Sequence, residues 1–301
     1  MAQERNVAVP EVIIGRRPKR PLWVTLSRIA RQKPLGTVSA SIIFLLILIA
    51  LSADLLSPYN PESTRSAWLL YPPSREHLMG GDYLGRDILS NVIHGARLSL
   101  TVGIMSVFLG TIMGTIIGTL SAYFGGRSDF IIQRFVDAWM SFPTLILAIS
   151  IVAFLGPSAL NVILAIATTI IPTTSRVVRG AVLSVKENQY IEAVRAIGAS
   201  NLRIMLRHVL PNVMAPVIIL ASIALGNAII AEASLSFLGL GTPPPASSWG
   251  RMLGTEAIRY MTDAPWILLF PALAISIVVL SFNLLGDTVR DVLDPRLRGS
   301  R

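Results

Sequence analysis

Cysteine is absent from this chain of 301 residues, and charge is scarce, because only 14% of the residues are Asp, Glu, Lys or Arg. An average soluble domain carries about 25%. Without cysteine the chain can form no disulfide, thiolate nucleophile or thiolate metal site. The three histidines, His77, His94 and His208, are not paired at the spacing of metal ligands. We therefore expect neither a metal site nor a histidine-based proton site.

The chain is rich in apolar residues. Hydrophobic residues make up 52% of the sequence, and the mean hydropathy is +0.63. A membrane span needs about 20 mostly apolar residues. Runs without a charged residue cover 34–53, 98–126, 138–175, 209–231 and 264–286.

The run 138–175 is too long for one helix, and Gly156-Pro157-Ser158 divides it into two spans joined by a tight turn. The sequence therefore predicts an all-α, polytopic membrane bundle of six transmembrane helices. In the second run, four glycines would share one helix face and permit close helix packing. They are Gly103, Gly110, Gly114 and Gly118.

These runs define the expected organisation. We expect a basic tail (1–34), a first transmembrane helix (35–57), an outer loop with an interfacial helix (58–97), a five-helix core (98–290) and a second tail (291–301). The first apolar run starts only at residue 34, so no cleavable signal peptide is expected.

The basic residues are unevenly distributed between the two sides of this predicted bundle. Most of them fall on the side of the two ends, and the other side has only Arg65, Arg75, Arg86, Arg97, Arg251 and Arg259. The positive-inside rule then places both termini in the cytoplasm. We attribute the formal charge of +9 to basic residues that set the membrane topology and contact lipid headgroups. We therefore expect no nucleic-acid partner.

The cytoplasmic segment 176–212 has the pattern of a helical hairpin. Gly198 would stop a first helix, and Ser200 or Asn201 would cap a second one that runs to Pro211. Such a helix can pack on its own bundle, on lipid or in a groove of a soluble partner. Its apolar stripe at helical spacing consists of Tyr190, Ala193, Val194 and Ile197.

This segment resembles a known motif. Glu192-Ala193-Val194, then three residues, Gly198, nine residues and His208-Val209-Leu210-Pro211 is similar to the EAA loop of permease subunits in binding-protein-dependent ABC importers. Val194 and His208 stand where that family usually has Ala and Ile. The His form is similar to the dipeptide, oligopeptide and nickel branch.

Three further segments carry the same resemblance. They are 80–90 with 95–100, 233–241 with 249–253, and 283–296. The long first outer loop and the Leu-Asp-Pro ending resemble the second, C-type permease of the pair. The resemblance implies the fold of a type I ABC importer permease in a bacterial inner membrane.

The resemblance also implies partners and a coupling site. The partners are a second homologous permease, two cytoplasmic ATPase subunits, an extracytoplasmic solute-binding protein and membrane lipid. The chain has no GxxxxGK[ST] phosphate loop, so ATP and Mg²⁺ are expected on the ATPases, with no cofactor in this chain. The expected ATPase-coupling residues are Tyr190, Glu192, Ala193, Val194, Arg195, Ala196, Ile197, Gly198, Leu210 and Pro211.

Two polar residues of the fifth span are further candidates, for the transport pathway or a subunit interface. Glu232 is costly in an apolar span unless it faces a cavity, a partner or water. Pathway lining, a subunit-interface hydrogen bond and simple interfacial exposure all stay open for it. Asn227 is the second candidate.

Transport of peptides is the function that the sequence favours. Nickel, glutathione or another small solute is the alternative cargo, and an ATP-independent secondary carrier is the alternative class. The serines of the apolar runs have no nearby base, so we expect no catalytic residue and no enzyme. A carrier is disfavoured because internal charges are sparse and the two halves show no convincing repeat.

Overall fold

The structure is a computed structural model that describes residues 31–293, and in that part every regular element is helical. This confirms the predicted all-α class. The α-helices are α2 (Pro34–Leu51), α3 (Ala53–Leu56), α4 (Ile88–Phe124), α5 (Gly126–Met140), α6 (Thr144–Leu155), α7 (Ala159–Lys186), α8 (Gln189–Ala196), α9 (Asn201–Ile204), α10 (Leu210–Phe237), α11 (Trp249–Met252), α12 (Thr255–Arg259) and α13 (Trp266–Leu293). A 3₁₀ turn, η1 (Ser66–Trp68), and a π-helical segment, η2 (Met205–Val209), complete the set.

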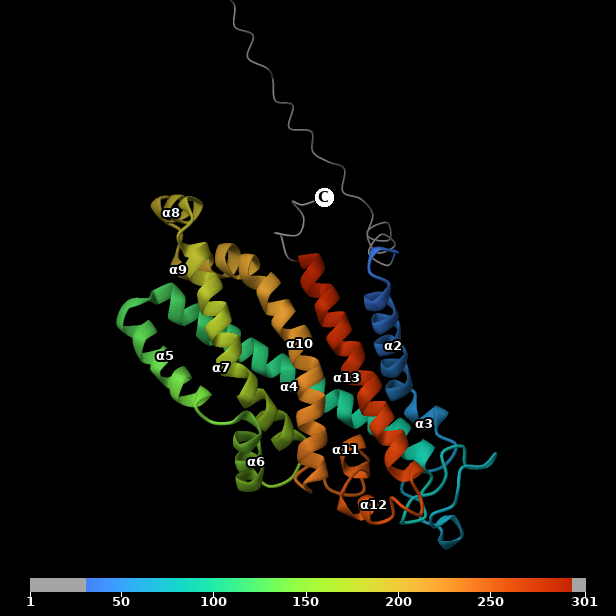
Figure 1. Ribbon diagram of the computed structural model, residues 1–301. Coiled ribbons are helices and arrows are strands. Elements are labelled where there is room, and N and C mark those ends of the chain that lie inside the picture. The colour runs from blue at the N-terminus through green and yellow to red at the C-terminus, as the bar shows by residue number, and fades with distance from the viewer. Residues whose placement is uncertain (1–30, 294–301) are drawn as a thin grey trace, which may run out of the picture.

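The long helices lie side by side in one bundle (Figure 1). Helices α2, α4, α7, α13 and the continuous helix Asn201–Phe237 are each long and apolar enough to cross a membrane. Helices α5 and α6 pass the same test together, although they are bent by 89°. Counting this bent pair as one span confirms the predicted six. The start of α2 and the end of α13 lie at the same end of the bundle, as an even number of crossings requires.

Several predicted boundaries were wrong, and the reasons are local. Helix α4 begins at Ile88, not near residue 98, because the Asp87 carboxylate accepts a hydrogen bond of 2.8 Å from the Ser90 amide and caps the helix. The third span begins at Gly126 and is broken after Met140. Pro143 causes this break, because proline disfavours helical backbone in the residue before it.

The turn between α6 and α7 lies where the sequence predicts it. Gly156 ends α6 with a φ of +87°, a conformation that glycine adopts without steric cost. The Ser158 hydroxyl then accepts a hydrogen bond of 3.1 Å from the Asn161 amide and caps α7.

The glycine face of α4 packs closely against neighbouring helices, as predicted, and most of it meets α7. A Cβ atom on Gly110, Gly114 or Gly118 would lie 2.4–2.8 Å from a backbone carbonyl oxygen of α7. Gly103, farther along the same face, lies against the side chain of Ile229 in α10. Because lipid supplies no hydrophobic drive for helix association, such close backbone approach is what holds the two helices together.

The first helix is fastened to the core at both ends. At one end, the Lys33 Nζ lies 2.5 Å from the Asp291 carboxylate of α13. At the other end, the Arg97 guanidinium donates to the Ala50 carbonyl at 2.9 Å and pairs with Asp54 at 2.9 Å. Hydrogen bonds to Asp54, mainly from Arg97 and to a lesser extent from His94, hold the pKa of its carboxyl group below the usual value.

We expect the substitution Gly118→Ala to destabilise the bundle by about 1–3 kcal/mol, because the new methyl group would meet the Ser175 carbonyl oxygen at 2.4 Å. Thermal unfolding in detergent measures the effect. The matched control is Gly180→Ala in α7, where a Cβ has no neighbour within 4 Å. Equal stability of the two variants would contradict this account of the α4–α7 contact.

Candidate functional site

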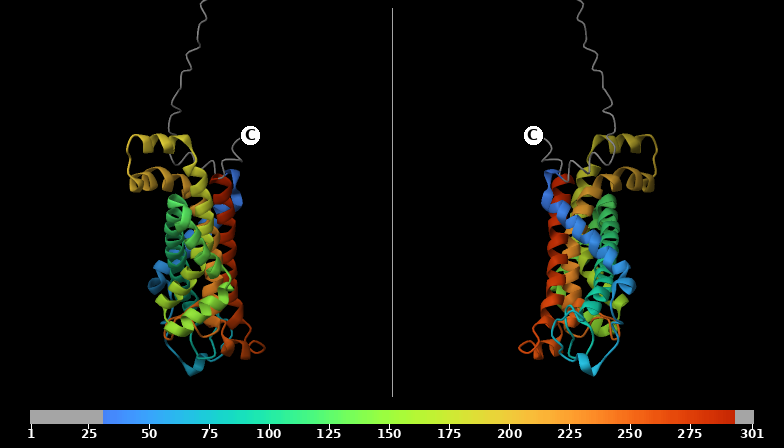
Figure 2. Two further views of the ribbon diagram at one scale, coloured as in Figure 1. Left: turned by 90° about the vertical axis from the view of Figure 1, so that its left-hand side faces the viewer. Right: turned by 90° about the vertical axis from the view of Figure 1, so that its right-hand side faces the viewer.

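Helices α8 and α9 form a hairpin, joined by residues 197–200, that extends sideways past the bundle (Figure 2). The turn is a Schellman motif: the Gly198 amide donates to the Arg195 carbonyl at 3.0 Å, and the Ala199 amide donates to the Val194 carbonyl at 3.3 Å. Gly198 has a φ of +85°. The helix therefore stops where the sequence predicts, and glycine is what permits the turn.

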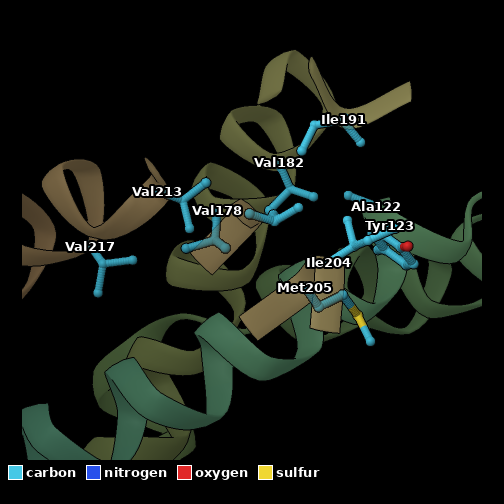
Figure 3. Close-up of a cluster of buried hydrophobic side chains, with 10 residues drawn as sticks. Ala122, Tyr123, Val178, Val182, Ile191, Ile204, Met205, Val213 and Val217 are labelled. Carbon is cyan, nitrogen blue, oxygen red and sulfur yellow. The ribbon is translucent and has the colours of Figure 1, made fainter. Parts of the chain in front are cut away.

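The inner face of the hairpin is fixed to the bundle. Ile191 and Ile204 are completely buried in a cluster with the ends of α4 and α7 (Figure 3). The other labelled members of this cluster are Ala122, Tyr123, Val178, Val182, Met205, Val213 and Val217. The Tyr123 hydroxyl also donates to the Asn201 side-chain oxygen at 2.9 Å. The hairpin and the ends of α4 and α7 therefore form one packed unit.

The outer face of the hairpin is bare. Of the predicted apolar stripe, only Val194 turns partly toward the bundle, and the buried residue of α8 is Ile191, which the stripe missed. The Ile197 side chain is 84% exposed. The predicted coupling residues that lie exposed in this chain are Tyr190, Glu192, Ala193, Arg195, Ala196, Ile197, Gly198 and Pro211. Tyr190 and Leu202 of the hairpin and Leu206 just after it are also exposed, and a group of large apolar side chains on the surface is typical of an interaction site.

The second helix of the hairpin does not end at Pro211 as predicted. It passes through η2 into α10, with Leu210 partly buried at the join. The Asn212 side-chain amide donates to the His208 carbonyl at 2.7 Å and to the Tyr190 hydroxyl at 3.2 Å. These bonds fix α8 against the start of α10, so Tyr190 positions the hairpin as well as facing outward.

An ion-pair network that the sequence reasoning missed joins α5 to α7 beneath the hairpin. The Arg179 guanidinium donates to both oxygens of Asp129, at 2.7 and 2.5 Å, and Arg176 pairs with Asp137. The Ser121 hydroxyl of α4 donates to the same Asp129 carboxylate. These residues are far apart in the sequence, so their spacing carried no signal of the pairing.

Glu232 lies inside the subunit. Its side chain is 2% exposed and accepts hydrogen bonds from Ser99 of α4 at 2.9 Å and from Ser236 at 2.7 Å. The Ser99 hydroxyl in turn accepts a bond of 3.4 Å from the Trp249 amide of α11. Within this chain the carboxyl group is enclosed, and its bond to Ser99 connects α10 to α4.

Asn227, in contrast, is exposed and faces a groove of 430 Å³ between α6, α7 and α10. Most of its walls are apolar, with a few hydroxyl groups. The polar side chains of this groove are Thr144, Thr169, Thr173, Thr174, Asn227 and Ser234. The sequence analysis missed the threonines and Ser234, although their helical spacing was a signal. Such walls can donate and accept hydrogen bonds along a passing solute.

Comparison with solved structures identifies the fold of the chain. The solved structure of the MetNI methionine ABC transporter, in inward-facing conformations, contains a chain of the same fold. The TM-score is 0.56 and the sequence identity 20%, over 69% of this chain and 98% of that one. The chain therefore shares its fold with a chain of this ABC transporter.

Sequence comparison is more specific. Residues 99–299 match the family of binding-protein-dependent transport system inner membrane components, and residues 22–73 match the N-terminal transmembrane domain of oligopeptide transport permease C. A Brucella suis protein named for a peptide transport system permease is 43% identical over 99% of this chain and 98% of its own length. The glutathione transport system permease protein GsiD of Escherichia coli O157:H7 is 43% identical over 93% of this chain and 92% of its own length.

The chain belongs to the family of binding-protein-dependent transport system inner membrane components, as an ABC importer permease subunit of the peptide and glutathione group. This confirms the resemblance on which the sequence analysis relied. It makes the chain a multi-pass membrane protein with a transport role.

We expect Gly198→Ala to loosen the hairpin by about 1–2 kcal/mol, because an L-residue at a φ of +85° is strained. Hydrogen exchange of the amides in 189–204 measures the effect. Gly198→Asn is the matched variant, since asparagine tolerates this conformation better, and it should keep more protection. Equal protection in both variants would contradict the proposed role of the turn.

Proposed function

We propose that this chain forms one half of the membrane pathway of an ATP-driven importer of peptides, and that the α8–α9 hairpin receives the movement of an ATPase subunit. The observation that carries the proposal is the contrast between the two faces of the hairpin. Ile191 is buried against the bundle, while Ile197 is 84% exposed beyond it. A rigid projection with a bare apolar tip is suited to docking in a groove of a soluble partner.

The proposed orientation places the hairpin and both termini in the cytoplasm. The excess of Lys and Arg at that end supports this orientation through the positive-inside rule. ATP and Mg²⁺ would then bind to two separate ATPase subunits, and this chain would hold no cofactor. Closure of the ATPases would move the hairpins and switch the bundle between inward-open and outward-open states, a rigid-body transition.

The groove between α6, α7 and α10 supplies the proposed pathway wall. Asn227 and the groove hydroxyls offer hydrogen bonds to peptide groups, and the groove is open on one side in this chain. A second homologous permease would close it, and an extracytoplasmic binding protein would deliver the cargo. Glutathione is the second candidate cargo, because a relative that is 43% identical is named as a glutathione permease.

The docking test uses Ile197→Asp and Glu192→Lys in the complex assembled with its ATPases. Both side chains are exposed in this chain, so we expect the protein to insert and to fold with wild-type stability. We expect the ATPase subunits to dissociate during purification, and uptake to fall at least about tenfold. Ile197→Val is the control that keeps the apolar tip. Wild-type uptake by the Ile197→Asp complex would show that this face does not couple transport to ATP hydrolysis.

The pathway test uses Asn227→Leu, which removes the amide and keeps the approximate volume. We expect uptake of a dipeptide and of glutathione to fall severalfold, while the ATPase subunits stay bound, because polar contacts to the passing solute are lost. Uptake into proteoliposomes, with the binding protein present, measures the change. Ser222→Ala, on the same helix but outside the groove-lining set, is the control. Unchanged uptake of both solutes would exclude Asn227 from the pathway.

A further inference from the structure

A second groove, separate from the proposed pathway, lies between α4 and the helix that leaves the hairpin. Its volume is 330 Å³, and every lining side chain is either apolar or a threonine. The lining residues are Thr111, Ile112, Thr115, Ile116, Thr119, Leu120, Leu202, Met205, Leu206, Leu210, Met214 and Val217. We call it the α4–α10 groove. It lies next to the hairpin, because Leu202 and Leu206 belong to the hairpin's second helix and its continuation.

The threonines of the α4 wall lack hydrogen-bond partners. Thr111, Thr115 and Thr119 are four residues apart, so they share one helix face, and each is 7–8% exposed. Their hydroxyl oxygens have no partner within residues 31–293. A buried hydroxyl without a partner is unfavourable. Because these oxygens are enclosed, the threonines offer almost no polar surface to the groove, and its wall is apolar.

Two arginines lie beside the groove on the hairpin side. Arg203 and Arg207 are exposed and alternate with the groove residues Leu202 and Leu206 along the same helical segment. Neither guanidinium forms an ion pair with any described residue, and both line a neighbouring hollow together with Val194, Ile197, Gly198, Ala199 and His208. The segment thus presents an apolar side to the groove and a cationic side next to it. This is the pattern of a helix that lies at a membrane surface.

The size and charge of this site select one occupant. A groove of 330 Å³ with an almost wholly apolar lining suits an alkyl chain. The exposed, unpaired arginines beside it offer an anion two guanidinium groups, and basic pockets on the cytoplasmic side of membrane helices bind anionic lipid headgroups. We propose that the α4–α10 groove holds an acyl chain of an anionic phospholipid whose phosphate is bound by Arg203 and Arg207.

This inference rests on the proposed function in one respect, because it needs the hairpin at the cytoplasmic membrane surface. The bound lipid would fill the space between α4 and the helix leaving the hairpin. It would thereby support the hairpin beside the Ile191 cluster, whose members Met205 and Val217 also line the groove. Lipid composition would then set how firmly the hairpin is held against the bundle.

The test starts from the purified, delipidated complex in detergent. It is titrated with dioleoylphosphatidylglycerol or with dioleoylphosphatidylcholine, and thermal unfolding and native mass spectrometry are recorded. We expect phosphatidylglycerol to raise the melting temperature and to remain bound at about one molecule per copy of this chain. The double variant Arg203→Gln/Arg207→Gln should bind phosphatidylglycerol at least about tenfold more weakly than the wild type. Arg195→Gln on α8 should bind it like the wild type, because Arg195 lines neither hollow.

A second variant tests the groove independently of the arginines. Thr115→Trp should fill the groove and abolish lipid retention while both arginines remain. The proposal fails if both lipids stabilise equally, if the double arginine variant binds like the wild type, or if inorganic phosphate alone gives the same shift. It also fails if a cysteine placed at Ile116, in a chain that has no native cysteine, crosslinks to the second permease or an ATPase.

The readout separates this inference from the proposed function. Lipid retention is measured without nucleotide and without transport. Glu192 lines neither hollow, so Glu192→Lys should lose uptake and keep the lipid if both proposals hold. Loss of lipid binding in the arginine variant with wild-type uptake in Glu192→Lys would support the lipid site and overturn the coupling role.

Discussion

The burial of Ile191 and Ile204 against the ends of α4 and α7 is the contact on which the rest depends. Helix α7 runs without interruption from its turn with α6 to Lys186, and the hairpin begins three residues later. Because packed interiors are dense, a displacement of the hairpin cannot be absorbed within the cluster and must pass to the long helices. An exposed tip alone would only bind a partner. The buried face is what would transmit a displacement of the tip to the bundle under the proposed function.

The helices of the membrane bundle are held together by other contacts than the apolar cluster at the hairpin. Apolar side chains gain little by leaving lipid, so α4 and α7 are held by direct backbone approach at Gly110, Gly114 and Gly118. The broken span is held by polar contacts instead. Arg179 binds Asp129 in two bonds, and this pair joins α5 to the very helix that leads into the hairpin. Movement of α7 therefore reaches α5 directly.

The lack of water in a membrane made part of this fold predictable from the sequence. A span must be helical and free of charge, so apolar runs located most of the bundle, and Gly156 and Gly198 located two turns. Long-range pairing was out of reach. Asp129 and Arg179 follow two separate apolar runs, and nothing in their spacing indicates that they pair. For Glu232 the sequence leaves a pathway, a subunit interface and interfacial exposure open. Two serine hydroxyls, one of them from the distant helix α4, satisfy Glu232, and no spacing rule encodes that long-range contact.

The groove between α6, α7 and α10, which we propose as a pathway wall, has side chains that limit how it can bind a peptide. Its lining contains threonine, serine and asparagine but no acidic or basic side chain. A peptide in zwitterionic form carries a charged group at each end, and burial of an unpaired charge is costly. The groove can therefore hydrogen-bond the amide groups that all peptides share, but it offers no ion pair to either terminus. Under the proposed function, recognition of the charged termini would therefore come from outside this groove.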